Sequence, residues 1–450
     1  MMSPNSRRIC IILSHDAWGT CFDRRILHQA DILADEGYSV FIACFRAKTI
    51  RKSAPKTQAQ NGPIEVLNRR SYRLILCDYA DCAELPPLAL PVPSFRPSAL
   101  RIHICRLLLG PLTIIKALFP GSQYVAKLIQ NIATTISSPL VFDLPLLQAV
   151  LDACSSNDLD LKVPTPSLIV ACDTTTARAG YILKAIYSCR LWLDMHEYYS
   201  RQRAFSLYAQ RYISCVEKFV CKYADRIYTV NPMLADRISS DLGQPVFSLQ
   251  NYAVPSSPLA FDVPHLLSTA ERSPLNIVFH GGAGPFRNIH NLVNAFICMP
   301  PDVALLTMFQ QGISPSLLRA ARRVPHISIK SYFHDHLLDY FLSCADAIII
   351  PYAGIDVNTT LCSPNKLGDA IALGKPVLFN SQLLYLRSLS SRYPSLIPVN
   401  CTSPQALRSS IVAAIPLVHK LTLAQKRAIY DDLGAPAQSE IFRQWVRQTL

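Results

Sequence analysis

The sequence lacks the long apolar run that a membrane-spanning helix requires. It contains no uninterrupted stretch of about 20 apolar residues, which is the length that crosses a bilayer. The N-terminus, MMSPNSRRICIILSHD, has too short an apolar run for a signal peptide. We therefore expect neither a transmembrane helix nor a secretory leader.

The 15 cysteines include no Cys-x-x-Cys pair, so the spacing typical of a structural zinc site is missing. Their number is odd, and several lie inside apolar runs, among them Cys10, Cys44, Cys189 and Cys344. This pattern favours buried, reduced thiols in a cytoplasmic protein over a framework of disulfides.

Motifs for nucleic-acid binding are also missing, although the formal net charge is +13 and the pI is about 9.1. A basic chain can bind nucleic acid, acidic lipid or a phosphorylated ligand. The basic residues here are scattered, and neither an RNP sequence nor a Cys-His finger occurs. We therefore expect no nucleic-acid partner.

The segment ALRIHICRLLLGPLTIIKALFP, residues 99–120, comes nearest to a membrane span. Three basic residues interrupt it, and Pro111 stands near its middle. It is typical of a basic amphipathic segment that lies on an anionic membrane surface. A pair of core helices in the first domain is the alternative.

What the chain does contain is repeated alternation of strands and helices. With 450 residues it is long enough for two domains of about 200 residues each. The β-α-β pattern begins with a strand at 8–13, a helix at 24–37 and a strand at 38–43, and it starts again with a strand at 275–280. Such units form parallel sheets.

These patterns predict an α/β protein made of two doubly wound, Rossmann-like domains. The predicted boundaries are an N-terminal domain at 1–252, a linker at 253–273, a second domain at 274–420 and a C-terminal helix at 421–450 that packs back toward the first domain. In the second domain the strands after 275–280 are expected at 303–309, 326–330, 346–351 and 376–380.

Ligands of doubly wound sheets bind beyond the carboxyl ends of the strands. In the first domain this rule selects the loop Asp16–Asp23, Asp173, and the pair His196-Glu197. In the second domain it selects three segments, which are 281–287, 352–358 and 363–369. Two such domains that face each other form a cleft suited to two substrates.

The stretch SPNKLGDAIALGKPVL, residues 363–378, predicts a helix followed by a buried strand. Ser363 suits the N-cap, Pro364 the first helical position, and Asp369 the first turn. The free N–H groups of a helix start attract phosphate, and a nearby acid can hold a ribose diol. An ordinary helix–strand unit without a ligand is the alternative.

Three further motifs have both a functional and a structural interpretation. GGAGPFR, residues 281–287, lacks the third glycine of a dinucleotide fingerprint, but Arg287 can neutralise a phosphate. The pair His196-Glu197 is either an acid/base pair or a structural strand end. Asp158-Leu159-Asp160 resembles a metal motif but lies in a polar run, which favours a solvated loop.

Five segments stand in order along nearly the whole chain: FDRRILHQADILADEGYSV; ACDTTT with LWLDMHEYYS; VEKFVCKYADRIYTVNPMLADRI with LQNYAVP; FHGGAGPFRNIHNLVNAF; and ADAIIIPYAGIDVNTTLCSPNKLGDAIALGKPVL. Together they resemble the segments of GT-B glycosyltransferases, close to glycosyltransferase family 4 of bacterial cell-surface polysaccharide synthesis. The last is similar to the donor-site signature of that family, usually a variant of P-N-K-x-x-E-x-x-A-x-G-K-P-V.

The resemblance implies a GT-B enzyme whose two Rossmann-like domains face each other across a cleft. The domain at 1–252 would be the acceptor-side domain, and the domain at 274–420 would bind the nucleotide-sugar donor. Such a hexosyltransferase moves a sugar from a nucleotide-diphosphate donor to a glycan or lipid-linked acceptor, with retention and without a metal or other cofactor. The implied location is the cytoplasm, including the cytoplasmic face of the inner membrane, where residues 99–120 would contact anionic lipid.

The resemblance also implies roles for particular residues. Asp173 and His196 face the acceptor, where one of them orients or deprotonates its hydroxyl, and Glu197 fixes the imidazole. Donor binding is implied for Gly281, Gly282, Arg287, Asn358, Pro364, Asn365, Lys366 and Asp369.

Three positions depart from the family pattern, and they leave other functions open. Asp369 stands where a glutamate is usual, Leu361 where many members have a second glutamate, and Asn288 where a glycine is common. One alternative is a non-catalytic or partner-dependent protein that binds a nucleotide sugar. The other is a nucleotide-sugar epimerase, which shares the two-domain fold.

Overall fold

The computed structural model describes residues 8–18, 23–46, 65–68, 71–77, 143–158, 162–254, 274–282, 284, 286–309, 312–330, 338 and 341–449. Contacts between Cα atoms divide the chain into a first unit, Met1–Ser248 with Phe442–Leu450, and a second unit, Leu249–Ile441. The sequence analysis places the end of the first domain at residue 252. The segment 99–120 and most of the predicted linker lie outside the described residues.

The first unit contains an eight-stranded sheet in the order β3-β4-β2-β1-β5-β6-β7-β8. Only the edge pair β3 and β4 is antiparallel, and the other neighbours are parallel. The strands are β1 (Arg8–Trp18), β2 (Tyr38–Arg46), β3 (Glu65–Asn68), β4 (Tyr72–Cys77), β5 (Leu168–Cys172), β6 (Arg190–Met195), β7 (Arg226–Thr229) and β8 (Phe247–Ser248).

Strand β1 is longer than the sequence predicts. The expected strand ends at residue 13, but pairing with β2 resumes at Ala17 after a shift of register that begins beyond Leu13. His15 and Asp16 therefore belong to an irregular strand end and not to a loop. A bulge of this kind redirects side chains, and bulges are common beside active sites.

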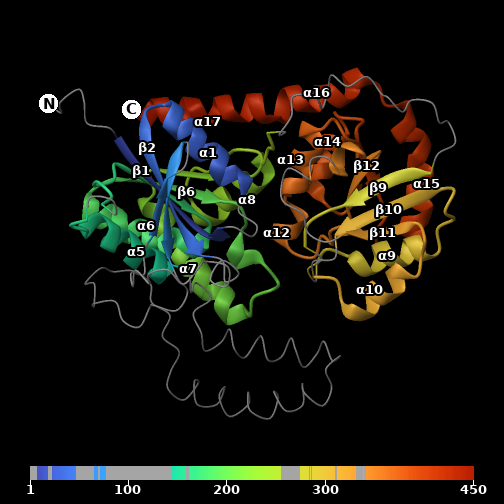
Figure 1. Ribbon diagram of the computed structural model, residues 1–450, viewed down its shortest axis with the longest axis horizontal. Helices are drawn as coiled ribbons and strands as arrows, with labels where there is room; N and C mark the ends of the chain where they lie inside the picture. Colours follow the sequence, from blue (N-terminus) through green and yellow to red (C-terminus); the bar gives the residue numbers. More distant parts are fainter. Residues whose placement is uncertain are drawn as a thin grey trace, which may run out of the picture. The chain divides into compact units, whose positions relative to one another are not determined.

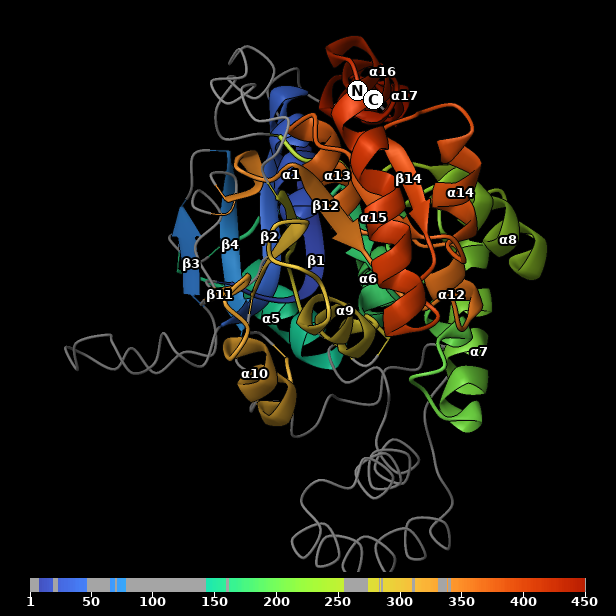
Figure 2. The same cartoon turned by 90° about the vertical axis from the view of Figure 1, so that its right-hand side faces the viewer.

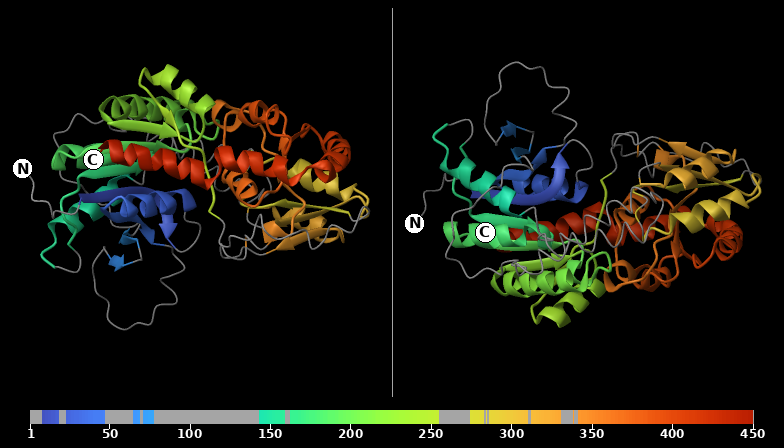
Figure 3. Two further views of the ribbon diagram at one scale, coloured as in Figure 1. Left: turned by 90° about the horizontal axis from the view of Figure 1, so that it is seen from above. Right: turned by 90° about the horizontal axis from the view of Figure 1, so that it is seen from below.

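Helices cover both faces of the first sheet. Figure 1 shows α1 and the C-terminal part of α17 on one face, and α5, α6 and α7 on the other. Seen from above, the blue strands and the green helices α7 and α8 lie at opposite edges of this unit (Figure 3). The bounds are α1 (Arg24–Asp35), α5 (Asp143–Ser155), α6 (Thr174–Tyr187), the 3-10 turn η1 (Tyr199–Arg201), α7 (Leu207–Tyr223), α8 (Pro232–Leu242) and α17 (Ala435–Thr449).

Close packing fixes the central strand β5 against helix α6. All five residues of β5 are buried, as expected for a parallel strand covered on both faces. A Cβ atom at Gly180 of α6 would lie 2.9 Å from the side chains of Ala171 and Leu191. Glycine at this position therefore lets the helix approach the sheet closely.

The C-terminus of the chain closes the first unit. The sequence predicts one helix at 421–450, but the structure has two, α16 (Leu423–Leu433) and α17. From Phe442 onward α17 belongs to the first unit, where Phe442 packs edge-on against Trp192 and Trp445 contacts Phe247. Ion pairs from two arginines of α17 to Glu36 hold it beside α1.

The second unit contains a six-stranded parallel sheet in the order β11-β10-β9-β12-β13-β14. Figure 2 shows α15 crossing in front of this sheet toward α9, and contacts join α15 to both β14 and α9. The elements are β9 (Leu275–Phe279), α9 (Ile289–Ile297), β10 (Ala304–Phe309), α10 (Pro315–Arg322), β11 (Ile327–Lys330), β12 (Ala347–Ile350), α12 (Val357–Thr360), α13 (Asn365–Ala372), β13 (Val377–Asn380), α14 (Leu384–Ser390), β14 (Leu396–Val399) and α15 (Pro404–Lys420).

The predicted strands of this unit are all present, and β14 is one that the sequence analysis omitted. Its four residues, LIPV, include Pro398, whose ring cannot donate a ladder hydrogen bond. A proline is tolerated here because β14 is the edge strand of the sheet.

The described cysteines carry no disulfide. Cys10, Cys44 and Cys189 are buried as expected, whereas Cys344 is exposed, contrary to its apolar sequence context. Among the described helices, none alone has the length and apolar character to cross a membrane, while one bent pair, Pro404–Lys420 with Leu423–Thr449, passes on length and composition.

Candidate functional site

The strand order reverses once in each sheet, and ligands of doubly wound sheets bind at such a switch point. In the first unit the strands that follow β1 in the chain are added on one side of it, and the strands from β5 onward are added on the other side. β1 and β5 are therefore neighbours in the sheet. In the second unit β9 and β12 have the same relation. The carboxyl ends of these two strand pairs are therefore the places to examine.

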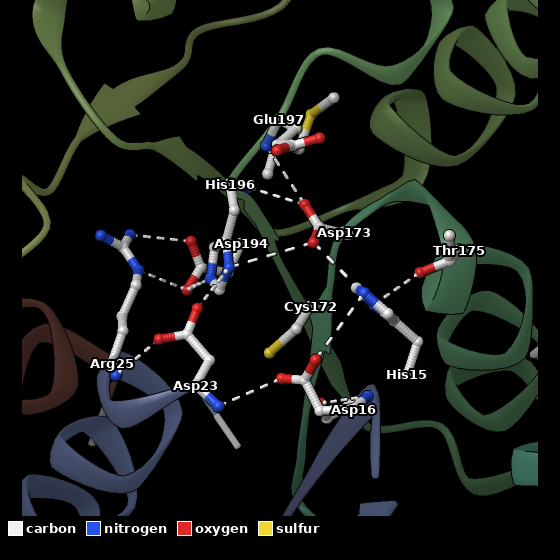
Figure 4. Close-up of polar contacts among 12 residues, drawn as sticks. His15, Asp16, Asp23, Arg25, Cys172, Asp173, Thr175, Asp194, His196 and Glu197 are labelled. Atoms are coloured by element: carbon white, nitrogen blue, oxygen red, sulfur yellow. Dashed lines mark hydrogen bonds and ion pairs between the residues drawn. The ribbon is translucent and has the colours of Figure 1, made fainter. Parts of the chain in front are cut away.

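The switch point of the first unit gathers five acidic side chains and two histidines (Figure 4). They come from the end of β1, the start of α1, the residue after β5, the strand β6 and the turn after β6. The residues are His15, Asp16, Asp23, Asp173, Asp194, His196 and Glu197.

A buried ion pair lies at the bottom of this cluster. The guanidinium of Arg25 binds both carboxylate oxygens of Asp194, at 2.9 and 2.8 Å, and Gln29 donates to the same carboxylate at 2.6 Å. Both charged side chains are essentially inaccessible to solvent. Burial alone would raise the pKa of Asp194, but the charge of Arg25 holds it below the usual range.

His196 lies next to this ion pair and between two carboxylates. Its Nε2 is 2.9 Å from Asp194 Oδ2, and its Nδ1 is 3.2 Å from Asp23 Oδ2. Burial would lower the pKa of His196, but Asp194 and Asp173 outweigh it and raise this pKa well above the usual value. An imidazolium cannot accept a proton, so His196 is suited to orient a substrate and not to act as a base.

Asp173 has a strained backbone and a buried carboxylate. Its φ of 65° and ψ of 164° fall in a region that is nearly reserved for glycine, and such strain is concentrated at functional sites. Its carboxylate does not cap helix α6 but accepts from the backbone N–H groups of His196 and Glu197, at 2.9 and 3.2 Å. Burial raises the pKa of Asp173 to about 6, so at neutral pH it is ionised yet basic enough to take a proton.

The structure corrects the expected role of Glu197. The imidazole of His196 is held by Asp194 and Asp23, whereas the Glu197 side chain accepts a hydrogen bond from Gln202. Glu197 contributes to the site through its backbone N–H, which donates to Asp173. A strand-end motif does not reveal which of two adjacent side chains turns toward the sheet.

Tyr199 is a residue of this site that the sequence analysis missed. Burial, together with the nearby carboxylates of Asp173 and Glu197, raises the pKa of its hydroxyl well above the usual value. Its position three residues after His196, in the run HEYYS, is the only sequence signal.

The switch point of the second unit is cationic and contains one tyrosine between two basic groups. The Lys366 ammonium donates to the Tyr352 hydroxyl at 2.7 Å, and the Arg287 guanidinium stacks 3.9 Å from the centre of the same ring. Lys366 is buried at the start of α13, and Arg287 is half-buried just before α9. Tyr352 comes shortly after β12, and Arg287 comes after β9 in the chain. Because β9 and β12 are neighbours in the sheet, the two cations meet at Tyr352.

The glycine turn after β9 leaves room for the ammonium of Lys366. Gly281 has a φ of +83°, a conformation that side chains rarely adopt, and an added Cβ would lie 2.8 Å from Lys366 Nζ. Gly282 has open space where its Cβ would be. The turn therefore lets an anion approach the backbone and Lys366 together.

The start of helix α13 differs in detail from the prediction. Pro364 occupies the N-cap position, not the first helical position, and the Ser363 hydroxyl accepts from Gln250 instead of capping the helix. Asp369 falls beyond the first turn and is buried, with Oδ2 3.5 Å from Nε2 of His280 at the end of β9. His280 was not among the predicted site residues.

Asn358 and Asn365 lie on the same edge of this unit but differ in exposure. Asn358 is buried in the short helix α12, which Asp356 caps, while Asn365 is exposed at the start of α13.

Three potential metal ligands meet within 4.8 Å in the described part of the chain, and these are Cys172, Asp194 and His196. They fit a metal ion poorly. Asp194 is neutralised by Arg25, and burial raises the pKa of the Cys172 thiol well above its usual value, which disfavours the thiolate that binds metals. The cluster is better described as an ion-pair network.

No protein family and no curated protein matches this chain in sequence. Solved structures match along almost all of it. Sucrose-phosphate synthase from Thermosynechococcus elongatus has a TM-score of 0.60 at 14% identity, with 98% of this chain and 99% of that chain covered. HepE from Anabaena, in complex with UDP-glucose, has a TM-score of 0.57 at 12% identity, with 98% of each chain covered.

A trehalose-6-phosphate synthase, studied with bisubstrate glycomimetics of glycosyl transfer with retention, has a TM-score of 0.56 at 9% identity, with 98% of this chain and 99% of that chain covered. These neighbours are GT-B glycosyltransferases. The chain therefore has the GT-B fold, with two parallel α/β sheets, as the sequence resemblance predicted.

Proposed function

We propose that this chain is a glycosyltransferase that moves a sugar from a nucleotide-diphosphate donor to a glycan or lipid-linked acceptor, with retention at the anomeric carbon. The observation that supports it most is the chemical difference between the two switch points. One pairs two cations around Tyr352, and the other presents an ionised, weakly basic Asp173. A donor diphosphate needs the first, and an acceptor hydroxyl needs the second.

On the donor side, Arg287 and Lys366 would bind the diphosphate and offset the charge that develops as it leaves. The N–H groups at the start of α13 add to this positive field. Because protein cations supply this charge, the proposed reaction requires no metal ion. Asp369, with His280 beside it, would hold the ribose hydroxyls.

On the acceptor side, the hydroxyl oxygen would attack the anomeric carbon on the same face that the diphosphate leaves, which retains the configuration, while the bond from that carbon to the diphosphate oxygen breaks. Asp173 would take the hydroxyl proton, and the nucleoside diphosphate would leave. His196 would keep its own proton and orient the acceptor. Removal of one such base typically slows a reaction by about 10²- to 10⁴-fold.

We also propose that the reaction serves cell-surface polysaccharide synthesis in the cytoplasm, at the inner membrane. The basic chain and the apolar, basic segment 99–120 support this. Flotation with anionic liposomes tests the contact, and a chain that stays in the soluble fraction at low salt would contradict it.

The donor site is tested by a thermal-shift panel of UDP, GDP, dTDP, ADP and CMP with their common sugar conjugates. A ligand of the native state raises the unfolding temperature with the logarithm of its excess over Kd. We expect one base to give a clear shift that Asp369→Ala removes. The comparison uses the ligand-induced shift, because the variant alone can also change stability.

A protein that binds nucleotide sugar without transferring it is the second candidate. It is favoured by one observation, that the short Asp369 carboxylate faces His280 of the protein itself. Sugar transfer by the purified chain would eliminate it. An epimerase would convert a nucleotide sugar with no acceptor present, so the same donor panel without acceptor separates the third candidate.

A further inference from the structure

Glu217 is a buried carboxyl group that the proposed reaction does not use. It lies on α7 and is 2% exposed. Its Oε1 accepts from the Thr174 hydroxyl at 3.0 Å and from the Ser200 backbone N–H at 3.2 Å. Its Oε2 is buried and has no hydrogen-bond partner among the described residues.

The two groups that Glu217 binds belong to the two segments that surround Asp173. Thr174 is the next residue in the chain and the first of α6. Ser200 lies in η1, directly after Tyr199 and close to the His196 and Glu197 amides that donate to the Asp173 carboxylate. One side chain thus connects the turn after β5 to the turn after β6.

Packing does not explain a carboxyl group at this position. A cavity of about 10 Å³, at the lower limit for one water molecule, adjoins it and is lined by Asp173, Thr174 and Glu217 together with Leu193, Met195 and Val220. A leucine would avoid the cost of the buried, unpartnered Oε2, but it would leave the Thr174 hydroxyl and the Ser200 N–H without this acceptor. The two hydrogen bonds that Glu217 accepts, and not its packing, therefore account for a carboxyl group at this position.

The strained conformation of Asp173 explains why these two hydrogen bonds matter. A non-glycine residue with φ of 65° and ψ of 164° persists only where its surroundings hold it. The His196 and Glu197 amides hold its carboxylate, and the bond from Thr174 to Glu217 holds the residue that follows. If Glu217 releases Thr174 and Ser200, Asp173 can relax and its carboxylate moves.

We propose that Glu217 is a positioning residue that keeps Asp173 in its strained conformation by joining Thr174 to Ser200. This inference rests on the proposed function of Asp173 as the base. Burial, which outweighs the hydrogen bonds from Ser200 and Thr174, raises the pKa of Glu217 to about 7. A neutral amide is therefore a fair substitute, and Glu217→Gln keeps the accepting oxygen that the role requires.

The test compares Glu217→Leu with Glu217→Gln in the full chain, with Lys218→Gln, an exposed neighbour on α7, as the control. Displacement of a catalytic group by about 1 Å can cost 10²-fold in rate. We expect Glu217→Leu to lower kcat by about 10- to 100-fold with the donor KM nearly unchanged. Glu217→Gln and the control should stay within about threefold of the wild type.

Hydrogen exchange of the backbone amides at 196–200 gives a readout that does not depend on activity. Their exchange should become at least about tenfold faster in Glu217→Leu, while amides of the second unit stay unchanged. If both kcat and this exchange match the wild type, the proposal is wrong. A wild-type chain without transfer activity would count against the proposed function, and the exchange data would still decide the role of Glu217.

Thr174→Val keeps the test decisive if Glu217→Leu does not fold. It removes the hydroxyl that donates to Glu217 with little change of side-chain volume. Faster exchange at 196–200 in this variant supports the proposal, and unchanged exchange overturns it.

Discussion

The two switch points of this chain share one topology and differ in charge. In each sheet the strand that comes first in the chain lies beside the strand at which the order reverses. These neighbours are β1 with β5 and β9 with β12. The first gathers carboxylates around an imidazolium, and the second gathers two cations around a tyrosine ring. The sheet therefore determines where a site lies, and the residues at the strand ends determine what it can bind.

The two switch points also differ in how they are held. In the first unit a buried ion pair and the strained Asp173 fix the geometry. In the second unit the cations lie against the rings of Tyr352 and Phe279 and contact the Tyr352 hydroxyl. A base must be aimed at a single proton, whereas a diphosphate offers several oxygens, so the first site needs the stricter support.

The largest expected effect is on transfer by Asp173→Asn. Asparagine keeps the size of the side chain, and its Oδ1 can still accept from the two backbone N–H groups that hold this residue, but it cannot take a proton. We expect kcat to fall by about 10²- to 10⁴-fold while nucleotide affinity stays unchanged, because the proposed donor site belongs to the second unit. Steady-state kinetics with a nucleotide titration measure both, with the exposed Asp158→Asn as the control. A variant that keeps kcat would show that the first switch point has no base.

The next effect is on stability, through Arg25→Met. This change leaves Asp194 as a buried carboxylate without its guanidinium, and broken buried pairs typically cost about 3–5 kcal/mol. Lys184→Met breaks the more exposed pair with Asp225 and should cost about 1 kcal/mol or less. Urea unfolding followed by tryptophan fluorescence, with Trp192 in the first unit, reports the difference. Equal losses would remove the argument that the buried pair supports the site.

A smaller effect is expected for nucleotide binding by Lys366→Met. The loss of one charge-assisted contact should weaken the affinity for a nucleoside diphosphate by about 10- to 100-fold. The exposed Arg319→Met, a cation of the same unit away from the switch point, serves as the control. Isothermal titration with the base found in the thermal-shift panel measures both variants. Equal affinities would place the diphosphate elsewhere.

The smallest effect is the pH dependence of transfer. Asp173 acts as a base only when ionised, and burial raises its pKa to about 6, so kcat/KM should fall as the pH drops through 6. The decrease should approach tenfold per pH unit below that midpoint. Because Glu217 also titrates near neutrality, the profile is repeated in Glu217→Gln. If the acid limb moves in that variant, it belongs to Glu217 and not to Asp173.

Whether the sequence predicts the structural role of a residue depends on how near in the chain the residues that determine this role are. The run SPNKLGDAIALGKPVL predicted α13 and β13 because apolar spacing acts within a few positions, although Ser363 does not cap the helix. The role of Tyr352 could not be predicted, since its two cationic neighbours lie 65 and 14 residues away in the chain, with Arg287 at one end and Lys366 at the other. The same holds for Arg25, which finds Asp194 across 169 residues.

By itself the sequence determined the two α/β sheets, the order of their elements and the edge of each sheet that carries polar residues, because periodicity and capping are local properties. Only the tertiary structure decided the protonation of these residues. Asp173 and His196 both follow buried strands, yet burial raises the pKa of Asp173, while neighbouring carboxylates raise the pKa of His196 against the effect of its burial. The pKa of a side chain depends on every charge and every buried surface around it, and these come together only when the chain is folded.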